Sequence, residues 1–495
     1  MGLLQNQNIE FHMRDSLQKT LQSNIQGDVF FKKEFINYYS VDASSYQIYP
    51  KIIVIAKNEK DISNTIKIAK KFKTSVTVRG AGTGLVGSAL NNGIILDLKK
   101  FDSIKVNKNY VTVGPGTLKG QLDKILKKSK KFFPPNPSIG SFCSIGGMIG
   151  NNSSGSRSLK YGSVVDNVTE ITFIDGKGIK HTLPKNKIIS KKILDITKRT
   201  EFKKIPKVTK NSSGYKIDKI KTTKDTQNII IGSEGTLGII ISAKLKINKI
   251  PKNRILFIIE YKTITDAVKN AIQINDTNPS AIEFVDKITL KQIKFSFNKK
   301  TNCILFVEYD EKLISSEKKL KKIVTGKIIK KLNKELDIFQ WWRYRDASLH
   351  YSLKSIKKEK RIPHIIEDSA VPLENLLKLF TSLNKINKKY KTRSISYGHV
   401  GNGNIHIRLI SDRKRKQMIK NIAIEFFDEV IKLDGTITAE HGDGLARSEF
   451  IKKQYGKKNY QIFKEIKKLF DPNNILNPGK VISKKSTIID NLENF

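Results

Sequence analysis

Residues 75–87 read SVTVRGAGTGLVG, a β-branched stretch that runs straight into a loop of glycines. Between residues 82 and 87 the loop contains a formal GxGxxG, the pattern that holds a diphosphate in a Rossmann fold. A Rossmann loop must open a helix, whereas here the turn NNG at 91–93 leads into another strand at 93–98. The loop is therefore predicted to join strand to strand, with backbone N–H groups that can cradle a diphosphate.

Two further stretches are rich in glycine and serine. PPNPSIG at 134–140 leads into SIGGMIGNNSSG at 144–155 and KYG at 160–162, and GSEGTLG covers 232–238. Small residues leave little side-chain volume, so the backbone can approach a large flat ligand closely. Three such stretches in one half of the chain predict a shared ligand cavity rather than three unrelated turns.

The charge composition is unusual, with 92 Lys plus Arg against 46 Asp plus Glu and a net charge of +46. Such a charge suggests a polyanionic partner such as nucleic acid. Only 13 of the basic residues are Arg, however, and the Lys are scattered over every segment. We therefore expect solvated surfaces and no nucleic-acid partner.

The two cysteines, Cys143 and Cys303, exclude a disulfide framework, a Cys-ligated zinc site and an iron–sulfur cluster.

Hydropathy predicts a soluble protein. The chain has no uninterrupted apolar run of about 18 residues, and its first 15 residues lack the basic and apolar regions of a signal peptide. We expect a cytoplasmic location, and peripheral association with the inner face of a membrane stays open.

Alternating short strands and amphipathic helices predict an α+β fold with a domain boundary near residue 250. Among them, 228–247 is predicted as a strand and 315–336 as one Lys-rich helix.

Two short motifs gather histidines and a carboxylate: YGHVGNGNIH at 397–406 and TAEHGDG at 438–444. His399 and His406 are seven residues apart and would face opposite sides of one straight strand. The GNG between them predicts a hairpin that lets both reach one point. With Glu440 they form a set typical of a catalytic divalent ion. The alternative is that these histidines are ordinary core residues.

Together these stretches resemble the FAD-linked oxidases of the vanillyl-alcohol oxidase type, and within them the FAD-dependent D-2-hydroxyacid dehydrogenases. The resemblance extends over about residues 42–482, with the motifs in the same order. It implies a PCMH-type two-subdomain FAD-binding module and an α+β cap domain. The expected domains are a helical lead at 1–45, the FAD-binding module at 46–250, the cap at 251–450 and a helix returning to the FAD-binding module at 451–495.

By position, the resemblance assigns the diphosphate of FAD to the first glycine loop and the rest of the cofactor to the other glycine-rich stretches. The loop has Val78 and Arg79 and no histidine, so it implies noncovalent FAD. The implied cofactor-binding residues are Arg79, Gly80, Ala81, Gly82, Thr83, Gly84, Ser88, Pro137, Ser138, Ser144, Gly146, Asn151, Ser154, Gly155, Gly162, Glu234, Gly235, Ile240 and Asn477.

The resemblance also assigns roles in catalysis. His399, His406 and Glu440 would bind Zn²⁺ or Mn²⁺, with oxygens of the substrate in the open positions. His441 would take the proton of the hydroxyl as general base while the C2 hydrogen leaves as hydride to flavin N5. Arg345, in WWRYRD at 341–346, would bind the substrate carboxylate, unless it is a surface arginine of a helix.

Two positions depart from the family pattern. Asn402 stands where Asp is common, and Ile366 stands where members selective for 2-hydroxyglutarate have Lys. D-lactate is therefore the first expected substrate, with D-2-hydroxyglutarate and glycolate as alternatives and a sugar or aldonolactone as a weaker one. The expected electron acceptor is separate: a quinone, a cytochrome or an electron-transfer flavoprotein. A homodimer stays open.

Overall fold

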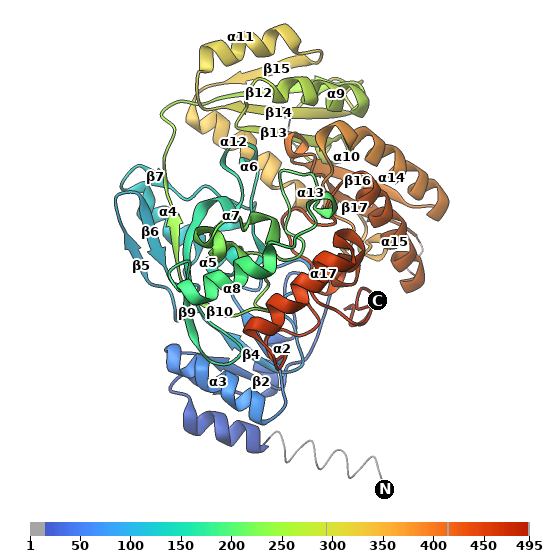
Figure 1. The fold of residues 1–495 in the computed structure, drawn as a ribbon. Coiled ribbons are helices and arrows are strands. Elements are labelled where there is room, and N and C mark those ends of the chain that lie inside the picture. The colour runs from blue at the N-terminus through green and yellow to red at the C-terminus, as the bar shows by residue number, and fades with distance from the viewer. Residues whose placement is uncertain (1–14, 294, 413–414, 494–495) are drawn as a thin grey trace.

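Among the described residues, three larger β-sheets and one two-stranded pair, with the helices around them, form the fold (Figure 1). The computed structural model describes residues 15–293, 295–412 and 415–493, so the expectation about a signal peptide falls largely outside the described residues. Two sheets belong to an N-terminal module before residue 250, and the third forms a C-terminal module after it. The predicted mixture of helices and sheets is confirmed.

The first sheet has the order β1-β2-β4-β3 and is parallel apart from β1. Its strands are short apolar runs, and α3 covers them with Ile62, Ile66 and Ala69 because these residues share one face of the helix. Asn58 caps α3 by accepting a hydrogen bond from the Asp61 N–H. The elements are β1 (Asp28–Phe30), α2 (Lys33–Tyr39), β2 (Ile52–Ile55), α3 (Glu59–Lys71), β3 (Val76–Arg79) and β4 (Ile94–Asp97).

The second sheet is antiparallel, with the order β5-β6-β10-β8-β9. Its strands are β5 (Ile104–Val106), β6 (Tyr110–Val113), β8 (Val168–Ile174), β9 (Lys180–Leu183) and β10 (Ile239–Lys246). The helices of this part are α4 (Lys119–Lys127), α5 (Ile145–Asn151), α6 (Ser158–Tyr161), α7 (Val164–Asn167) and α8 (Lys187–Thr197). A short pair, β7 (Lys131–Phe132) and β11 (Asn248–Lys249), lies beside them.

A helix from the far end of the chain completes the core of this second sheet. α17 (Ile451–Phe470), red in Figure 1, lies beside α8 and packs apolar side chains such as Phe463 and Ile466 against the sheet. After α17, Leu476 forms a parallel bridge with Val76 of β3. The last part of the chain therefore belongs to the cores of both N-terminal sheets.

The third sheet is antiparallel, with the order β15-β12-β14-β13-β16-β17. Helices cover both faces, which is why the central strand β12 is buried along its whole length: Phe257 faces one layer and Ile258 the other. The strands are β12 (Ile255–Tyr261), β13 (Ala281–Asp286), β14 (Cys303–Tyr309), β15 (Lys327–Leu332), β16 (Arg393–Gly398) and β17 (His406–Ile410).

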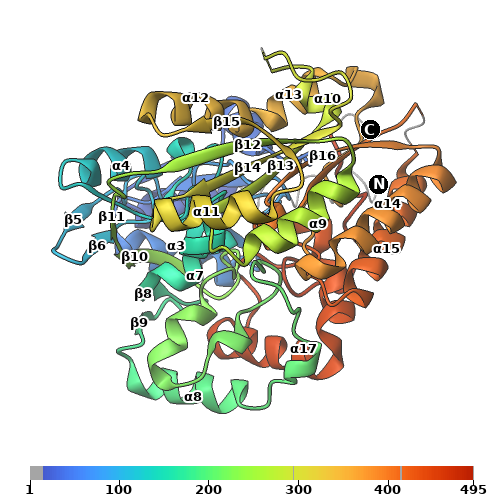
Figure 2. The same ribbon diagram turned by 90° about the horizontal axis from the view of Figure 1, so that it is seen from above.

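On one face of this sheet lie α9 (Ile264–Asn275), α11 (Leu313–Ile323), α14 (Leu376–Tyr390) and α15 (Lys416–Lys432), seen from above in Figure 2. On the other lie α10 (Lys287–Leu290), α12 (Glu335–Asp346) and α13 (Ser348–Lys354). The short α16 (Gly444–Arg447) precedes α17. No helix among the described residues is long and apolar enough to cross a bilayer.

Two predicted elements are wrong. The helix expected at 315–336 ends at Ile323, and Lys327–Leu332 form the edge strand β15 against β12. The strand expected at 228–247 begins only at Ile239, because the GSEGTLG segment before it forms tight turns in which Glu234 and Gly235 have positive φ. Two local predictions are confirmed: the first glycine loop joins β3 to β4, and GNG joins β16 to β17 as an antiparallel hairpin.

Candidate functional site

The glycine-rich stretches line the same cavity, where the N-terminal module meets the C-terminal module. Its empty space amounts to about 1550 Å³ including the opening to solvent. Most of the predicted cofactor-binding residues lie on the lining: Arg79, Gly80, Ala81, Gly82, Thr83, Gly84, Ser88, Pro137, Ser138, Ser144, Gly146, Asn151, Ser154, Glu234, Gly235 and Ile240.

Three predicted cofactor-binding residues are not part of the lining: Gly155, Gly162 and Asn477. The two glycines have φ angles of 148° and 70° and allow tight turns of the chain. Asn477 is buried, and its Nδ2 donates to the carbonyl oxygens of Ser88 (2.9 Å) and Glu234 (2.7 Å). Asn477 therefore ties two lining loops together.

Glu234 closes the cavity by a contact between the modules. Its carboxylate accepts hydrogen bonds from the backbone N–H groups of Asp443 (2.5 Å) and Gly444 (2.9 Å). Burial, together with the nearby carboxylate of Asp443, raises the pKa of Glu234 to about 7. The residue thus holds the His441 loop against the glycine-lined wall.

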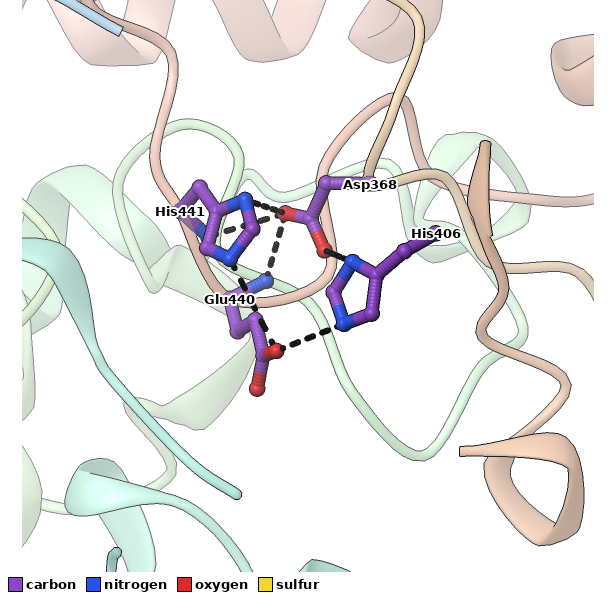
Figure 3. A group of neighbouring side chains, drawn as sticks. All are labelled: Asp368, His406, Glu440 and His441. Carbon is purple, nitrogen blue, oxygen red and sulfur yellow. Dashed lines mark hydrogen bonds and ion pairs between the residues drawn. The ribbon is translucent and has the colours of Figure 1, made fainter. Parts of the chain in front are cut away.

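At one end of the cavity three imidazoles converge on one oxygen of Glu440. The distances to Glu440 Oε1 are 3.1 Å from His399 Nε2, 3.2 Å from His406 Nε2 and 3.7 Å from His441 Nε2. Figure 3 shows His406 and His441 on either side of Glu440, and their rings stack with centroids 5.2 Å apart. The hairpin places the first two histidines, and the loop before α16 places the third with Glu440.

Carboxylates behind the histidines orient two of these rings. Glu283 Oε1 lies 2.8 Å from His399 Nδ1, and Glu367 Oε1 lies 2.5 Å from His441 Nδ1. A carboxylate at Nδ1 can hold the proton there, which leaves each Nε2 free to bind a metal ion that it shares with Glu440. Burial opposes the charged form of His441, but Asp368 and Glu367 outweigh it and raise its pKa.

Asp368 holds the loop that carries Glu440 and His441. Its Oδ2 accepts hydrogen bonds from Thr438 Oγ1 (2.6 Å) and from the backbone N–H groups of Ala439 (3.1 Å), Glu440 (2.9 Å) and His441 (2.8 Å). The carboxylate thereby satisfies a run of buried donors. It fixes the two side chains relative to the hairpin.

The N-terminal module contributes to the same cluster. Ser154 Oγ donates to Glu440 Oε2 (2.7 Å), and Lys210 Nζ lies 3.0 Å from it. Burial would raise the pKa of Glu440, but Lys210 and His399 hold it well below its usual range. Burial would lower the pKa of His406, but the carboxylates of Glu367 and Glu440 raise it to about 10.

The atoms of this cluster fit a small divalent ion. Among the described residues, Asp368, His406, Glu440 and His441 each place a possible ligand atom within 4.8 Å of the others. His399, from the predicted set, is outside this group but contacts Glu440. Glu440 Oε1 lies 3.1 Å from His399 Nε2 and 3.2 Å from His406 Nε2. Such separations suit pairs of ligand atoms that each lie ~2.0–2.2 Å from one tetrahedrally coordinated ion. Oδ2 of Asp368 already accepts the hydrogen bonds of the Glu440 loop, so only its Oδ1, 3.9 Å from His406 Nδ1, is available as a ligand.

Two arginines reach the cavity beside the histidines. Arg345 of α12 is buried, and its Nε donates to Glu283 Oε2 (2.6 Å), so its charge is matched within the protein. Arg408 of β17 also lines the cavity and is buried. The sequence predicted only Arg345.

The two departures from the family pattern have different surroundings. Asn402 Oδ1 accepts from Ser158 Oγ (3.0 Å), and its Nδ2 donates to Thr209 Oγ1 (2.8 Å), so it ties the hairpin to the N-terminal module and does not touch the histidines through these bonds. Ile366 is buried in the apolar core of the C-terminal module.

Several residues of the site were missed from the sequence: Glu283, Glu367, Asp368, Lys210 and Arg408. A sequence signal was available for three of them. Arg408 follows His406 by two residues and so shares its face of the strand. Glu367 and Asp368 directly follow Ile366, the position compared above with the family pattern.

Comparison with known domain families gives two matches. Residues 50–183 match the FAD binding domain, and residues 250–481 match the C-terminal domain of FAD linked oxidases. The first match contains the glycine loop, and the second contains the histidine cluster.

Curated relatives resemble the chain over most of its length. A glycolate oxidase subunit of Bacillus subtilis is 28% identical, covering 90% of this chain and 92% of its own. A D-lactate dehydrogenase of Anaerostipes hadrus is 28% identical over 88% and 90%. A D-2-hydroxyglutarate dehydrogenase of Haemophilus influenzae is 27% identical over 96% of this chain, which spans only 52% of that relative.

Solved structures share the fold. The structure of p-cresol methylhydroxylase with substrate bound superimposes with a TM-score of 0.70 at 14% identity, covering 95% of this chain and 97% of its own. An alkyldihydroxyacetonephosphate synthase gives 0.68 at 17% identity, covering 94% and 86%. At these identities the likeness concerns the arrangement of the elements alone.

Proposed function

The chain belongs to the FAD-linked oxidases, and from that premise we propose that it is an FAD-dependent dehydrogenase that oxidises a D-2-hydroxy acid to the 2-oxo acid. One observation carries the proposal: His399, His406 and His441 converge on Glu440 at the end of the glycine-lined cavity. The relatives named for glycolate, D-lactate and D-2-hydroxyglutarate support this substrate class. Electrons then pass to a separate quinone, cytochrome or electron-transfer flavoprotein.

The residues of the chain divide the work of alcohol oxidation among them. The glycine loop and the two other small-residue stretches bind FAD, which supplies the two-electron acceptor when bound. A divalent ion, Zn²⁺ or Mn²⁺, held by His399, His406 and Glu440 would polarise the substrate oxygens. Glu367 keeps a proton on His441 Nδ1, which leaves Nε2 to accept the proton of the hydroxyl.

Anaerobic reduction of the bound flavin tests the proposal. The purified holoenzyme should lose its visible flavin absorption when mixed with D-lactate, glycolate or D-2-hydroxyglutarate, but not with L-lactate or L-2-hydroxyglutarate. Incubation with a chelator should slow the reduction by about 100-fold, and added Zn²⁺ or Mn²⁺ should restore it. A protein that binds FAD but is reduced by none of these acids would contradict the proposed activity. Reduction that a chelator leaves unchanged would exclude the ion alone.

Gly150, at the end of α5, allows a test of the FAD site that does not depend on turnover. A Cβ at this position would meet no atom within 4 Å, and the residue lines the cavity. Gly150→Ala should therefore stabilise the FAD-free protein by about 0.5–1 kcal/mol, because Ala favours the helix. The same methyl group should weaken FAD binding by about tenfold or more, because it occupies cavity space.

Thermal unfolding of the FAD-free protein and FAD titration measure the two effects. Gly80→Ala is the contrasting variant, since its Cβ would lie 2.1 Å from Ser144 Oγ and should destabilise even the FAD-free protein. If Gly150→Ala binds FAD as tightly as the wild type, α5 does not face the cofactor.

A further inference from the structure

The two carboxylate oxygens of Glu440 have different partners. Oε1 faces the Nε2 atoms of His399 and His406, at 3.1 and 3.2 Å, on the side where the cluster can hold an ion. Oε2 accepts a hydrogen bond from Ser154 Oγ at 2.7 Å and another from Lys210 Nζ at 3.0 Å. The histidines belong to the C-terminal module, whereas Ser154 and Lys210 belong to the N-terminal module. Oε2 is therefore engaged by the N-terminal module, and Oε1 is left for an ion.

Lys210 contacts both segments that carry the predicted metal ligands. Its side chain is only 1% exposed. Besides Glu440 Oε2 in the loop before α16, its Nζ donates at 3.1 Å to Asn404 Oδ1 in the hairpin between β16 and β17. The Asn404 amide is itself oriented, because its Nδ2 donates to the carbonyl oxygen of Ser369 at 3.1 Å. Two oriented acceptors fix the buried ammonium, which in turn fixes Glu440 relative to the hairpin.

The chain around Lys210 lies between the loop before α16 and the cavity wall, the small-residue stretch 144–155. Two residues after Lys210, Ser212 Oγ lies within hydrogen-bond distance of two carbonyl oxygens, those of Ala439 (2.9 Å) and Asn152 (3.1 Å). Ala439 belongs to the loop that carries the metal-binding carboxylate, and Asn152 belongs to the cavity wall. The position of the cavity wall is therefore linked to the position of that loop.

We propose that Lys210 is a positioning residue for the metal ligand Glu440, and that FAD bound at the cavity wall raises the affinity of the histidine cluster for its ion. This inference rests on the proposed function and deepens it. Contacts of FAD with the cavity wall favour the arrangement in which Ser154 and Lys210 hold Oε2, and this arrangement leaves Oε1 to the ion. By linkage, the ion raises the affinity for FAD by the same factor.

Zn²⁺ binding, measured by competition with a chromophoric chelator, tests the role of Lys210. Lys210→Met should raise the Kd for Zn²⁺ by about 10–100-fold, the usual effect of losing a group that orients a metal ligand. Its affinity for FAD, measured without the ion, should stay close to that of the wild type, because Lys210 does not line the cavity. A merely structural role would weaken both. Lys207→Met is the matched control: Lys207 Nζ lies 3.0 Å from Asp434 Oδ2, its side chain is 66% exposed, and Zn²⁺ binding should not change.

The second measurement uses the wild type alone, so it does not depend on the folding of Lys210→Met. The Kd for Zn²⁺ should be at least about fivefold lower in the FAD-loaded protein than in the FAD-free protein, and Zn²⁺ should lower the Kd for FAD by the same factor. Equal Zn²⁺ affinities with and without FAD, or no Zn²⁺ binding, would overturn the inference. A Lys210→Met protein that binds Zn²⁺ as tightly as the wild type, or more tightly, would also overturn it. If the two affinities are coupled but no hydroxy acid reduces the flavin, the proposed function fails and the coupling stands.

Discussion

Replacing His441 with alanine is expected to lower kcat by about 10²–10⁴-fold, the usual contribution of a positioned general base. Nothing else among the described residues can take its place: His399 and His406 point their Nε2 atoms at Glu440, and Glu367 is occupied by His441 itself and by Arg447. KM should change little, because the residue acts on the proton and does not anchor the acid. Steady-state kinetics with a dye acceptor measure both parameters.

Removal of an exposed histidine provides the control. His350 lies on α13 at the surface, and His350→Ala should retain the activity of the wild type. The FAD and metal contents of His441→Ala should equal those of the wild type, which separates loss of a base from loss of the site. Added imidazole should restore part of the turnover. A fully active His441→Ala enzyme would refute the assignment.

Replacing Arg157 with alanine is expected to cost about 3–5 kcal/mol of unfolding free energy, because it leaves the buried Glu308 without its partner. Glu308 Oε1 and Oε2 lie 2.6 and 2.8 Å from Arg157 Nε and Nη2, and Trp342 Nε1 donates to the same carboxylate at 2.6 Å. Arg157 comes from the N-terminal module and Glu308 from the third sheet. The pair therefore joins the modules, and urea unfolding measures its contribution.

The pH dependence of this loss has a definite sign. Burial would raise the pKa of Glu308, but Arg157 lowers it below its usual value in the wild type. Without Arg157, the pKa of Glu308 in the folded variant rises above its value in the unfolded chain, so protonation of Glu308 stabilises the folded variant. The loss of unfolding free energy in Arg157→Ala should therefore be smaller at pH 5 than at pH 7. Arg199→Ala removes a pair with Glu465 in which the Arg199 side chain is 56% exposed, so it should lower the unfolding free energy far less than Arg157→Ala does. Similar losses in both variants would contradict the argument.

The parts of the site that depend on the backbone conformation of a few neighbouring residues could be predicted from the sequence. The NNG turn after the first glycine loop indicates a strand and not a helix, and GNG between His399 and His406 indicates a hairpin. The small residues at 144–155 likewise indicate a wall open to a ligand. In each case a few neighbouring residues determine the outcome.

Partners from distant segments could not be predicted in this way. Glu283 orients His399, yet it lies in the mostly apolar strand AIEFVD at 281–286, with no spacing to connect it to the histidines. The edge strand β15 was missed for a related reason. Its sequence KIIKKL also fits a Lys-rich helix, and the free edge of β12, far earlier in the chain, decides between the two.

The position of α17 has a consequence for how the protein is made. The core of the second sheet lacks Tyr455, Phe463 and Ile466 until residues 451–470 have left the ribosome, by which time every strand of the third sheet has been synthesised. Domains usually fold in order as they emerge, each with its own core. Here the first module stays incomplete until the last helix arrives, so the two modules are expected to reach the native state together, and the cavity between them forms in that same late step.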